Sequence, residues 1–83
     1  MITPKQIRAA RVLIGWQQSD LAEAAGLSLT GLSNIEKGYA DPKASTLTAI
    51  ESALRAAGVD LVDDNERIGV TIKRGVMAKD GAR

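Results

Sequence analysis

Residues 21–36 read LAEAAGLSLTGLSNIE, and this stretch decides the fold of the chain. An alanine-rich apolar run with a 3.6-residue period stops at Gly26, restarts after Ser28 and keeps the same period. A glycine can take the left-handed backbone conformation that ends one helix, and a serine can cap the next. The pattern therefore predicts a helix, a tight turn and a second helix. One side of that second helix carries small polar groups: Thr30, Ser33 and Asn34.

The composition is that of one small globular domain of 83 residues, with 45% apolar and 25% charged side chains. The chain has no cysteine and no histidine, which excludes disulfides, thiolate metal sites and histidine-based acid–base chemistry. We therefore expect no enzyme, no metal and no cofactor. No apolar run approaches the ~20 residues that span a bilayer, and the N-terminus lacks a signal-peptide layout. A cytoplasmic protein is expected.

The charges are unevenly distributed, although their sum is only +1. Acidic residues gather within 60–66, and basic residues lie in the N-terminal half of the chain: Lys5, Arg8, Arg11, Lys37 and Lys43. One basic face on a nearly neutral domain is compatible with nucleic-acid binding. The alternative is that these charges serve only solubility.

Four helices are predicted, at about 4–14, 18–25, 29–37 and 46–57. Thr3, Pro4 and Gln6 form a capping-box pattern before the first helix, and Ser45 is the expected cap of the fourth. Arg11 falls on the apolar stripe of the first helix, so it needs an acidic partner or must reach water. We expect Trp16 to pack the first helix on the second.

The period changes after residue 58. Residues 59–63 partly alternate, 64–67 are typical turn residues, and 68–73 are rich in β-branched side chains, so two paired strands are predicted. The strands fold back on their own bundle, or they pair with the strands of a second copy; we favour the second arrangement. The expected dimerisation residues are Val59, Leu61, Val62, Val70 and Ile72.

A set of residues with characteristic spacing runs through the helical part: Gln18, Leu21-Ala22, Ala25-Gly26, Leu27-Ser28, Leu32-Ser33, Ile35-Glu36, Gly38, Pro42, Leu47 and Leu54. On these residues the segment 4–58 resembles the phage repressor/Cro-type (Xre family) helix-turn-helix domain. The resemblance implies a mainly α fold, a compact four- to five-helix lambda-repressor-like bundle with a C-terminal two-strand β extension. We therefore divide the chain into a DNA-binding domain (1–58), the β extension (59–74) and a flexible tail (75–83).

The resemblance also implies roles for individual residues, with helix 29–37 in the major groove of DNA. The base-facing set is Ser28, Leu29, Thr30, Ser33 and Asn34, and the phosphate-contacting set is Gln18, Lys37, Lys43 and Tyr39. Leu29 departs from the pattern, because phage repressors commonly have a glutamine there, and a leucine can only meet a thymine methyl. Arg11 and Glu36 are expected to form a structural ion pair. A polar face that is merely solvated is the alternative for the base-facing set.

The function expected from this resemblance is sequence-specific regulation of transcription, most simply repression, by a homodimer on an inverted-repeat operator in double-stranded DNA. Two alternatives stay open. One is an antitoxin that represses its own operon and binds a cognate toxin. The other is a protein-interaction module that has kept the fold without specific DNA binding; the low net charge and Leu29 favour it mildly.

Overall fold

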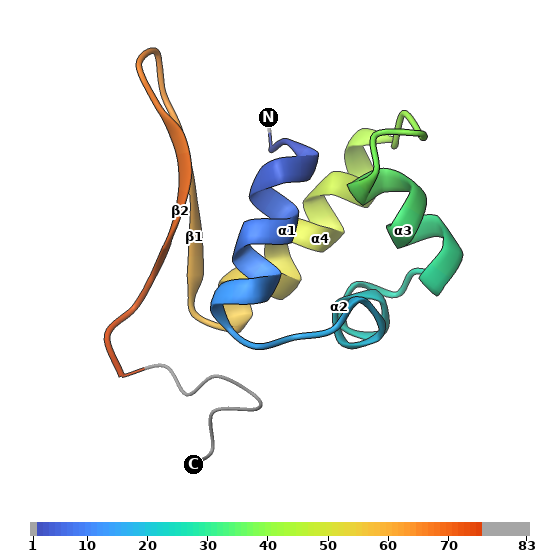
Figure 1. The fold of residues 1–83 in the computed structure, drawn as a ribbon, viewed down its shortest axis with the longest axis horizontal. Coiled ribbons are helices and arrows are strands. Elements are labelled where there is room, and N and C mark those ends of the chain that lie inside the picture. The colour runs from blue at the N-terminus through green and yellow to red at the C-terminus, as the bar shows by residue number, and fades with distance from the viewer. Residues whose placement is uncertain (1, 76–83) are drawn as a thin grey trace.

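The computed structural model describes residues 2–75, in which four helices are followed by a two-stranded antiparallel sheet (Figure 1). The elements are α1 Pro4–Leu13, α2 Gln18–Ala25, α3 Leu29–Glu36, α4 Ala44–Ala56, β1 Val59–Asp63 and β2 Ile68–Ile72. The predicted helical bundle with a β extension is confirmed, and the predicted bounds hold to within one or two residues. The tail expected at 75–83 lies, apart from Gly75, outside the described residues. Within 2–75, no helix is both long and apolar enough to cross a membrane.

The first three helices begin where the sequence predicts. At α1 the hydroxyl of Thr3 accepts the Gln6 N–H (3.2 Å), and the Gln6 side-chain oxygen accepts the Thr3 N–H (2.9 Å). This is the reciprocal capping box, with Pro4 as the first helical residue. At α3 the hydroxyl of Ser28 accepts the Gly31 N–H (3.0 Å). Gly26 ends α2 with a φ of 74°, a left-handed conformation that favours glycine.

The prediction for the start of α4 is wrong. Ser45 was expected to cap a helix at 46–57, but Lys43 occupies the cap position and makes no side-chain capping bond. The Lys43 carbonyl accepts the N–H groups of Thr46 (3.0 Å) and Leu47 (3.1 Å), so the chain is already helical at Ala44. A serine cap stabilises a helix by only ~1 kcal/mol, and an early start with alanine, the best helix former, outweighs it here.

The four helices and the first strand share one core. Its members come from every element except β2, and each is at most 6% exposed: Ile7, Ala10, Ile14, Leu21, Ala22, Leu32, Ile35, Ile50, Leu54 and Val59. Trp16 is half-buried and packs against this core; that it packs the first helix on the second stays a prediction. Leu27, from the turn between α2 and α3, packs against it as well, so that turn is fixed to the bundle.

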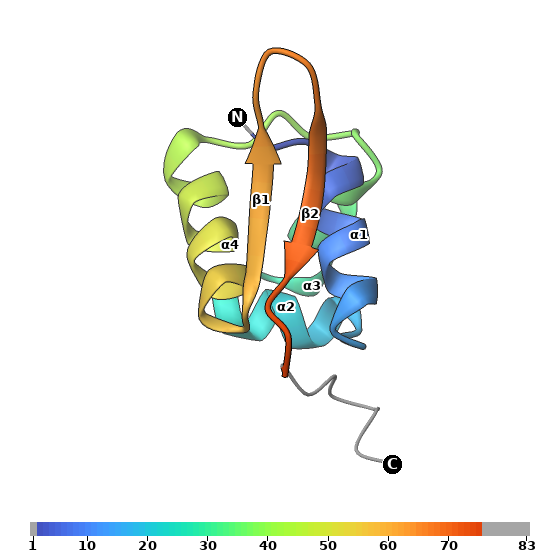
Figure 2. The same cartoon turned by 90° about the vertical axis from the view of Figure 1, so that its left-hand side faces the viewer.

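The two strands pair with each other within the chain and lie across α1 and α4 (Figure 2). The register pairs Val59 with Ile72 and Leu61 with Val70, and these four side chains contact the core of their own chain. Within one chain, the strands therefore fold back on their own bundle, and pairing with the strands of a second copy stays a prediction. Of the five expected dimerisation residues, only Val62 has its side chain on the opposite, outward face of the sheet, because successive strand residues alternate between faces.

Gln6 ties this sheet to α1. Its side-chain amide donates to the carbonyl oxygens of Val62 (2.8 Å) and Gly69 (2.9 Å), which are paired residues of the two strands. Because Val62 turns its side chain outward and Gly69 has none, no side chain of this pair fills the space on the α1 side, and the amide of Gln6 bonds there. Gln6 is only 2% exposed, and its amide oxygen is used by the capping box. One buried side chain thus joins the start of α1 to the middle of the hairpin.

Candidate nucleic-acid interface

Helix α3 has a buried side and an exposed, mostly polar side. Leu32, Ile35 and Glu36 are buried against the rest of the bundle. The opposite side carries Leu29, 52% exposed, and the exposed Thr30, followed one turn later by the half-buried Ser33 and Asn34. Four of the five predicted base-facing residues therefore share one stripe. The fifth, Ser28, lies just before the helix and uses its oxygen as the cap acceptor, which leaves its O–H able to donate.

Glu36 holds α3 to the two preceding helices. Its carboxylate accepts bonds from Arg11 Nε and Nη2, both at 3.0 Å, and from Gln18 Nε2 at 3.1 Å. Glu36 is 2% exposed, and the predicted ion pair is therefore formed and bidentate. Arg11 also donates from Nη1 to the carbonyl of Trp16 (3.0 Å), which fixes the link between α1 and α2. The orientation of α3 is set by a network that none of its exposed residues joins.

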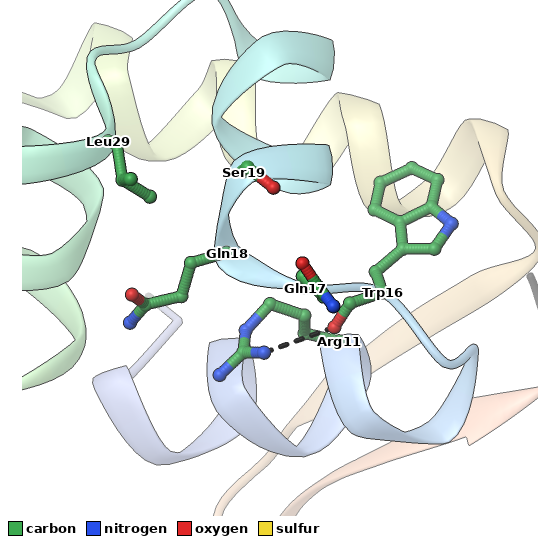
Figure 3. A pocket seen from close by; sticks show the side chains of 6 residues that line it. All are labelled: Arg11, Trp16, Gln17, Gln18, Ser19 and Leu29. Atoms are coloured by element: carbon green, nitrogen blue, oxygen red, sulfur yellow. Dashed lines mark hydrogen bonds between the residues drawn. The ribbon is translucent and has the colours of Figure 1, made fainter. Parts of the chain in front are cut away.

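A shallow hollow lies beside the first residue of α3, where α2 begins (Figure 3). Its lining residues are Arg11, Trp16, Gln17, Gln18, Ser19 and Leu29. Gln18 donates one of its two amide hydrogens to Glu36, and the second is available to a ligand. The same side chain can therefore brace α3 and donate to a ligand. The first N–H groups of a helix lack intrahelical partners and favour a phosphate. The hollow thus offers hydrogen-bond donors to an anion.

The predicted phosphate contacts are brought together only in part. Lys37 follows α3 directly, and its Nζ lies 5.9 Å from the ring centroid of Tyr39, a cation–π distance. The N–H of Tyr39 donates to the Asn34 carbonyl (2.9 Å), which keeps the loop close to the end of α3. Lys43 is exposed at the start of α4, at the other end of this loop, and makes no hydrogen bond or ion pair with the other predicted contacts among residues 2–75.

From the sequence, two further basic residues are only weaker candidates for phosphate contact, and they are not part of the predicted set. Lys5 and Arg8 of α1, together with Lys37, line a second hollow beside the last residues of α3. The available signal was their place in the basic set of the N-terminal half, but their distance in sequence from α3 concealed that they lie beside its end. Gln6 was also recognised only as half of a capping box, because nothing in a local pattern shows that its amide reaches the hairpin.

These features define a class of protein. A helix fixed by its buried side, with a polar stripe outward and donors at its start, is the arrangement of a helix-turn-helix DNA-binding domain. A family model described as helix-turn-helix matches residues 7–60, and the chain belongs to this family. The resemblance to phage repressor/Cro-type domains is confirmed, and family and fold are those of DNA-binding regulators of transcription rather than of enzymes.

Particular relatives support this assignment. The chain is 44% identical over 48 residues to the uncharacterized HTH-type transcriptional regulator Rv0023 of Mycobacterium tuberculosis and to its counterpart Mb0023 of Mycobacterium bovis. Each match covers 58% of this chain and 19% of the relative, so the chain spans about a fifth of the length of these regulators.

Two solved structures share the fold. The DNA-binding domain of the P22 c2 repressor is 27% identical, with a TM-score of 0.61 over 66% of this chain and 72% of that domain. The restriction-modification controller protein C.AhdI of Aeromonas hydrophila has the same TM-score over 63% of this chain and 79% of its own, at 23% identity. The likeness to the controller protein is therefore one of fold.

Proposed function

We propose that this protein is a sequence-specific DNA-binding regulator that acts as a homodimer on an inverted-repeat operator and represses transcription by occupying it. The observation that carries the proposal is the contrast between the two sides of α3. Its buried side is held by Glu36, Arg11 and Gln18, while its exposed stripe makes no side-chain hydrogen bond within the described residues. A recognition element needs this combination of fixed position and free polar edge.

The dimensions of α3 suit the major groove. With its side chains a helix is about 10–12 Å in diameter, which a groove about 12 Å wide admits, and eight residues at 1.5 Å each make α3 about 12 Å long. Asn34 is assigned a bidentate contact with adenine, in which its side-chain oxygen accepts from the N6–H and its side-chain N–H donates to N7. Thr30 is assigned a base edge or a thymine methyl, and Leu29 a thymine methyl.

Phosphates on either side would then position the helix. Gln18, at the start of α2, supplies a neutral donor, and Lys37 and Lys43 supply charge beyond the end of α3. Tyr39 supports Lys37 through its ring and presents its own hydroxyl, since it is 79% exposed. Each lysine that neutralises a phosphate adds about −0.9 to the slope of log affinity against log salt.

We propose two copies because the base-facing stripe of a single α3 is short. Five side chains at one helix specify few base pairs, so a second half-site supplies the remaining specificity. The hairpin leaves both of its edges without a strand partner within residues 2–75, and an edge strand is able to pair with another strand. We assign the subunit contact to this edge and to the outward-facing Val62, because the other four expected residues contact their own core.

The simplest regulatory consequence is repression, because a dimer seated on an operator excludes polymerase from overlapping DNA. A protein whose ligand is chromosomal DNA acts in the compartment that contains it, and we propose the cytoplasm of a bacterial cell.

The test compares Asn34→Ala with Ser52→Ala, both of which shorten one exposed or half-exposed polar side chain. Ser52 lies on α4, outside the proposed DNA contacts and outside the proposed subunit contact. On a duplex selected by the wild-type protein, Asn34→Ala should weaken binding by about 1–3 kcal/mol per half-site and relax one base preference, with Ser52→Ala unchanged. Equal binding by both variants and the wild type would refute the assignment of α3 as the reading helix.

A further inference from the structure

A second hollow of about 360 Å³ lies along the first half of α1, between the end of α3 and the start of β2. Three of its lining side chains are basic and exposed: Lys5, Arg8 and Lys37. Pro4 and Gly38 also line it, and Ile68 adds an apolar residue from the hairpin. Neither Lys5 nor Arg8 is among the DNA contacts proposed so far.

The positive charge of this hollow is not balanced by the residues that the structure describes. The one acidic lining residue is Glu36, and both of its oxygens are already bonded to Arg11 and Gln18. No ion pair involves Lys5, Arg8 or Lys37 in the part of the chain that the structure describes. Among residues 2–75, the three basic side chains therefore have no ion-pair partner.

The placement of these charges also opposes the stability of α1. The N-terminus of a helix carries a partial positive charge, which acidic residues normally offset, and the first turn of α1 contains none. Lys5 stands there instead, at the second helical position. Arg8 follows three residues later on the same side of the helix, and like charges at this spacing repel. The helix end adds to the positive potential of the hollow, and a bound anion would remove both unfavourable interactions.

The two hollows stand at opposite ends of α3. The first is lined by Leu29, the first residue of α3, and the second by Glu36 and Lys37, its last residue and its cap. A helix about 12 Å long therefore separates two regions that favour anions, and the two phosphate backbones of DNA border a major groove about 12 Å wide. With α3 in the groove, one hollow faces each strand.

We propose that Lys5, Arg8 and Lys37 bind a phosphate of the DNA backbone on the strand opposite the one bound at the start of α2. This inference rests on the proposed function, since it requires α3 to lie in the major groove. It makes α1 a direct contributor to DNA binding: Arg11 orients α3 from inside the network, and Lys5 and Arg8 hold the DNA.

The experiment measures binding of the full chain to its selected duplex by fluorescence anisotropy between 50 and 200 mM KCl. The variant is Lys5→Gln with Arg8→Gln, and the matched control is Lys73→Gln with Arg74→Gln, two exposed charges after the far end of β2. Loss of one phosphate contact per subunit, two per dimer, should make the salt slope shallower by about 1.8, so a fourfold rise in salt weakens the variant about 12-fold less than the wild type. The control should keep the wild-type slope.

A second measurement identifies the phosphate. Single methylphosphonate substitutions remove one backbone charge at a time, and one position in each half-site should weaken the wild type but not the Lys5→Gln/Arg8→Gln variant. Inorganic phosphate titrated into the DNA-free protein, followed by the amide NMR signals of residues 3–8, reports a site for a small free anion. Saturation there together with an unchanged salt slope in the variant would overturn the proposal.

The outcomes separate the two claims. If the wild-type protein shows no selective DNA binding, the proposed function fails and this inference fails with it. If the wild type binds selectively and the two double variants have the same slope and the same methylphosphonate profile, only the Lys5–Arg8–Lys37 site is overturned. Circular-dichroism melting of both variants confirms that each is folded, and melting of the Lys5→Gln/Arg8→Gln variant at or above the wild-type temperature agrees with relief of the unfavourable charges.

Discussion

Removal of the Glu36 carboxylate is the perturbation that tests the structural network most severely. In Glu36→Ala, the guanidinium of Arg11 loses two bonds of 3.0 Å while its side chain stays only 16% exposed. Breaking a buried ion pair by removing one partner costs about 3–5 kcal/mol, because the remaining charge is left without compensation. At about 0.05–0.15 kcal/mol per residue, a chain of this length has only about 4–12 kcal/mol of stability in total. The variant should be marginally folded or unfolded.

The assay is urea unfolding at one fixed protein concentration, followed by circular dichroism and by the fluorescence of Trp16, the single tryptophan. The Trp16 carbonyl accepts a bond from Arg11, so the indole is attached to the linker that the network fixes. Glu51→Ala is the matched control. It removes the exposed i,i+4 pair of Glu51 with Arg55 and should cost at most about 0.5 kcal/mol.

A double variant distinguishes burial of a charge from loss of packing. Replacing both partners, as in Arg11→Met with Glu36→Leu, removes the uncompensated charge and should recover most of the lost stability, since apolar substitutes for a buried pair are often neutral. Stability of Glu36→Ala within 1 kcal/mol of the wild type, combined with lost DNA binding, would refute this reasoning. It would mean that Glu36 acts on DNA rather than on the fold.

Three further predictions concern the turn, the hairpin and the subunit contact. Gly26→Ala should cost about 1–2 kcal/mol in urea unfolding, because φ is 74° there while no atom lies within 4 Å of the added Cβ; an unchanged midpoint would contradict the backbone argument. Gln6→Ala should cost about 1–3 kcal/mol and speed amide exchange in the hairpin more than in α2, and uniform exchange would show that the amide does not anchor the sheet. Val62→Asp should shift sedimentation towards monomer without lowering the monomer's stability; an unaltered dimer would place the contact elsewhere.

Local chemistry was sufficient to predict most of the helical architecture. The Thr3–Gln6 capping box, the left-handed Gly26 and the Ser28 cap are each set by a few neighbouring residues, and all three appear in the structure. The start of α4 was misjudged because the preference of Ser45 for a cap is small compared with the helical bonds gained by starting at Ala44.

Contacts between distant residues were predictable only where the family resemblance supplied them. The Arg11–Glu36 pair spans 25 residues and was expected from that resemblance, with the arginine on an apolar stripe as the independent signal. The bonds from Gln6 to the hairpin span 56 and 63 residues and left no such signal, because a polar side chain beside a cap has a sufficient local explanation.

The arrangement of the strands could not be decided from their pattern. An alternating pattern indicates that one face of a strand is buried. It does not indicate whether the surface that covers this face belongs to the same chain or to another. Here Leu61 and Val70 cover the chain's own core, which leaves the outward face and the edges for a partner. The hollow that Lys5 and Arg8 line could not be predicted from the sequence either. Only the packing of α1 on α3 brings these two residues beside Lys37.

The central claim is that two copies of α3 read two half-sites in adjacent major grooves. Selection of bound duplexes from a random DNA pool, at a salt concentration near 150 mM, tests it most directly. The account predicts an enriched inverted repeat whose half-site centres lie about one helical turn, or a whole multiple of it, apart. Enrichment of no sequence, or of a site without two-fold symmetry, would contradict the claim.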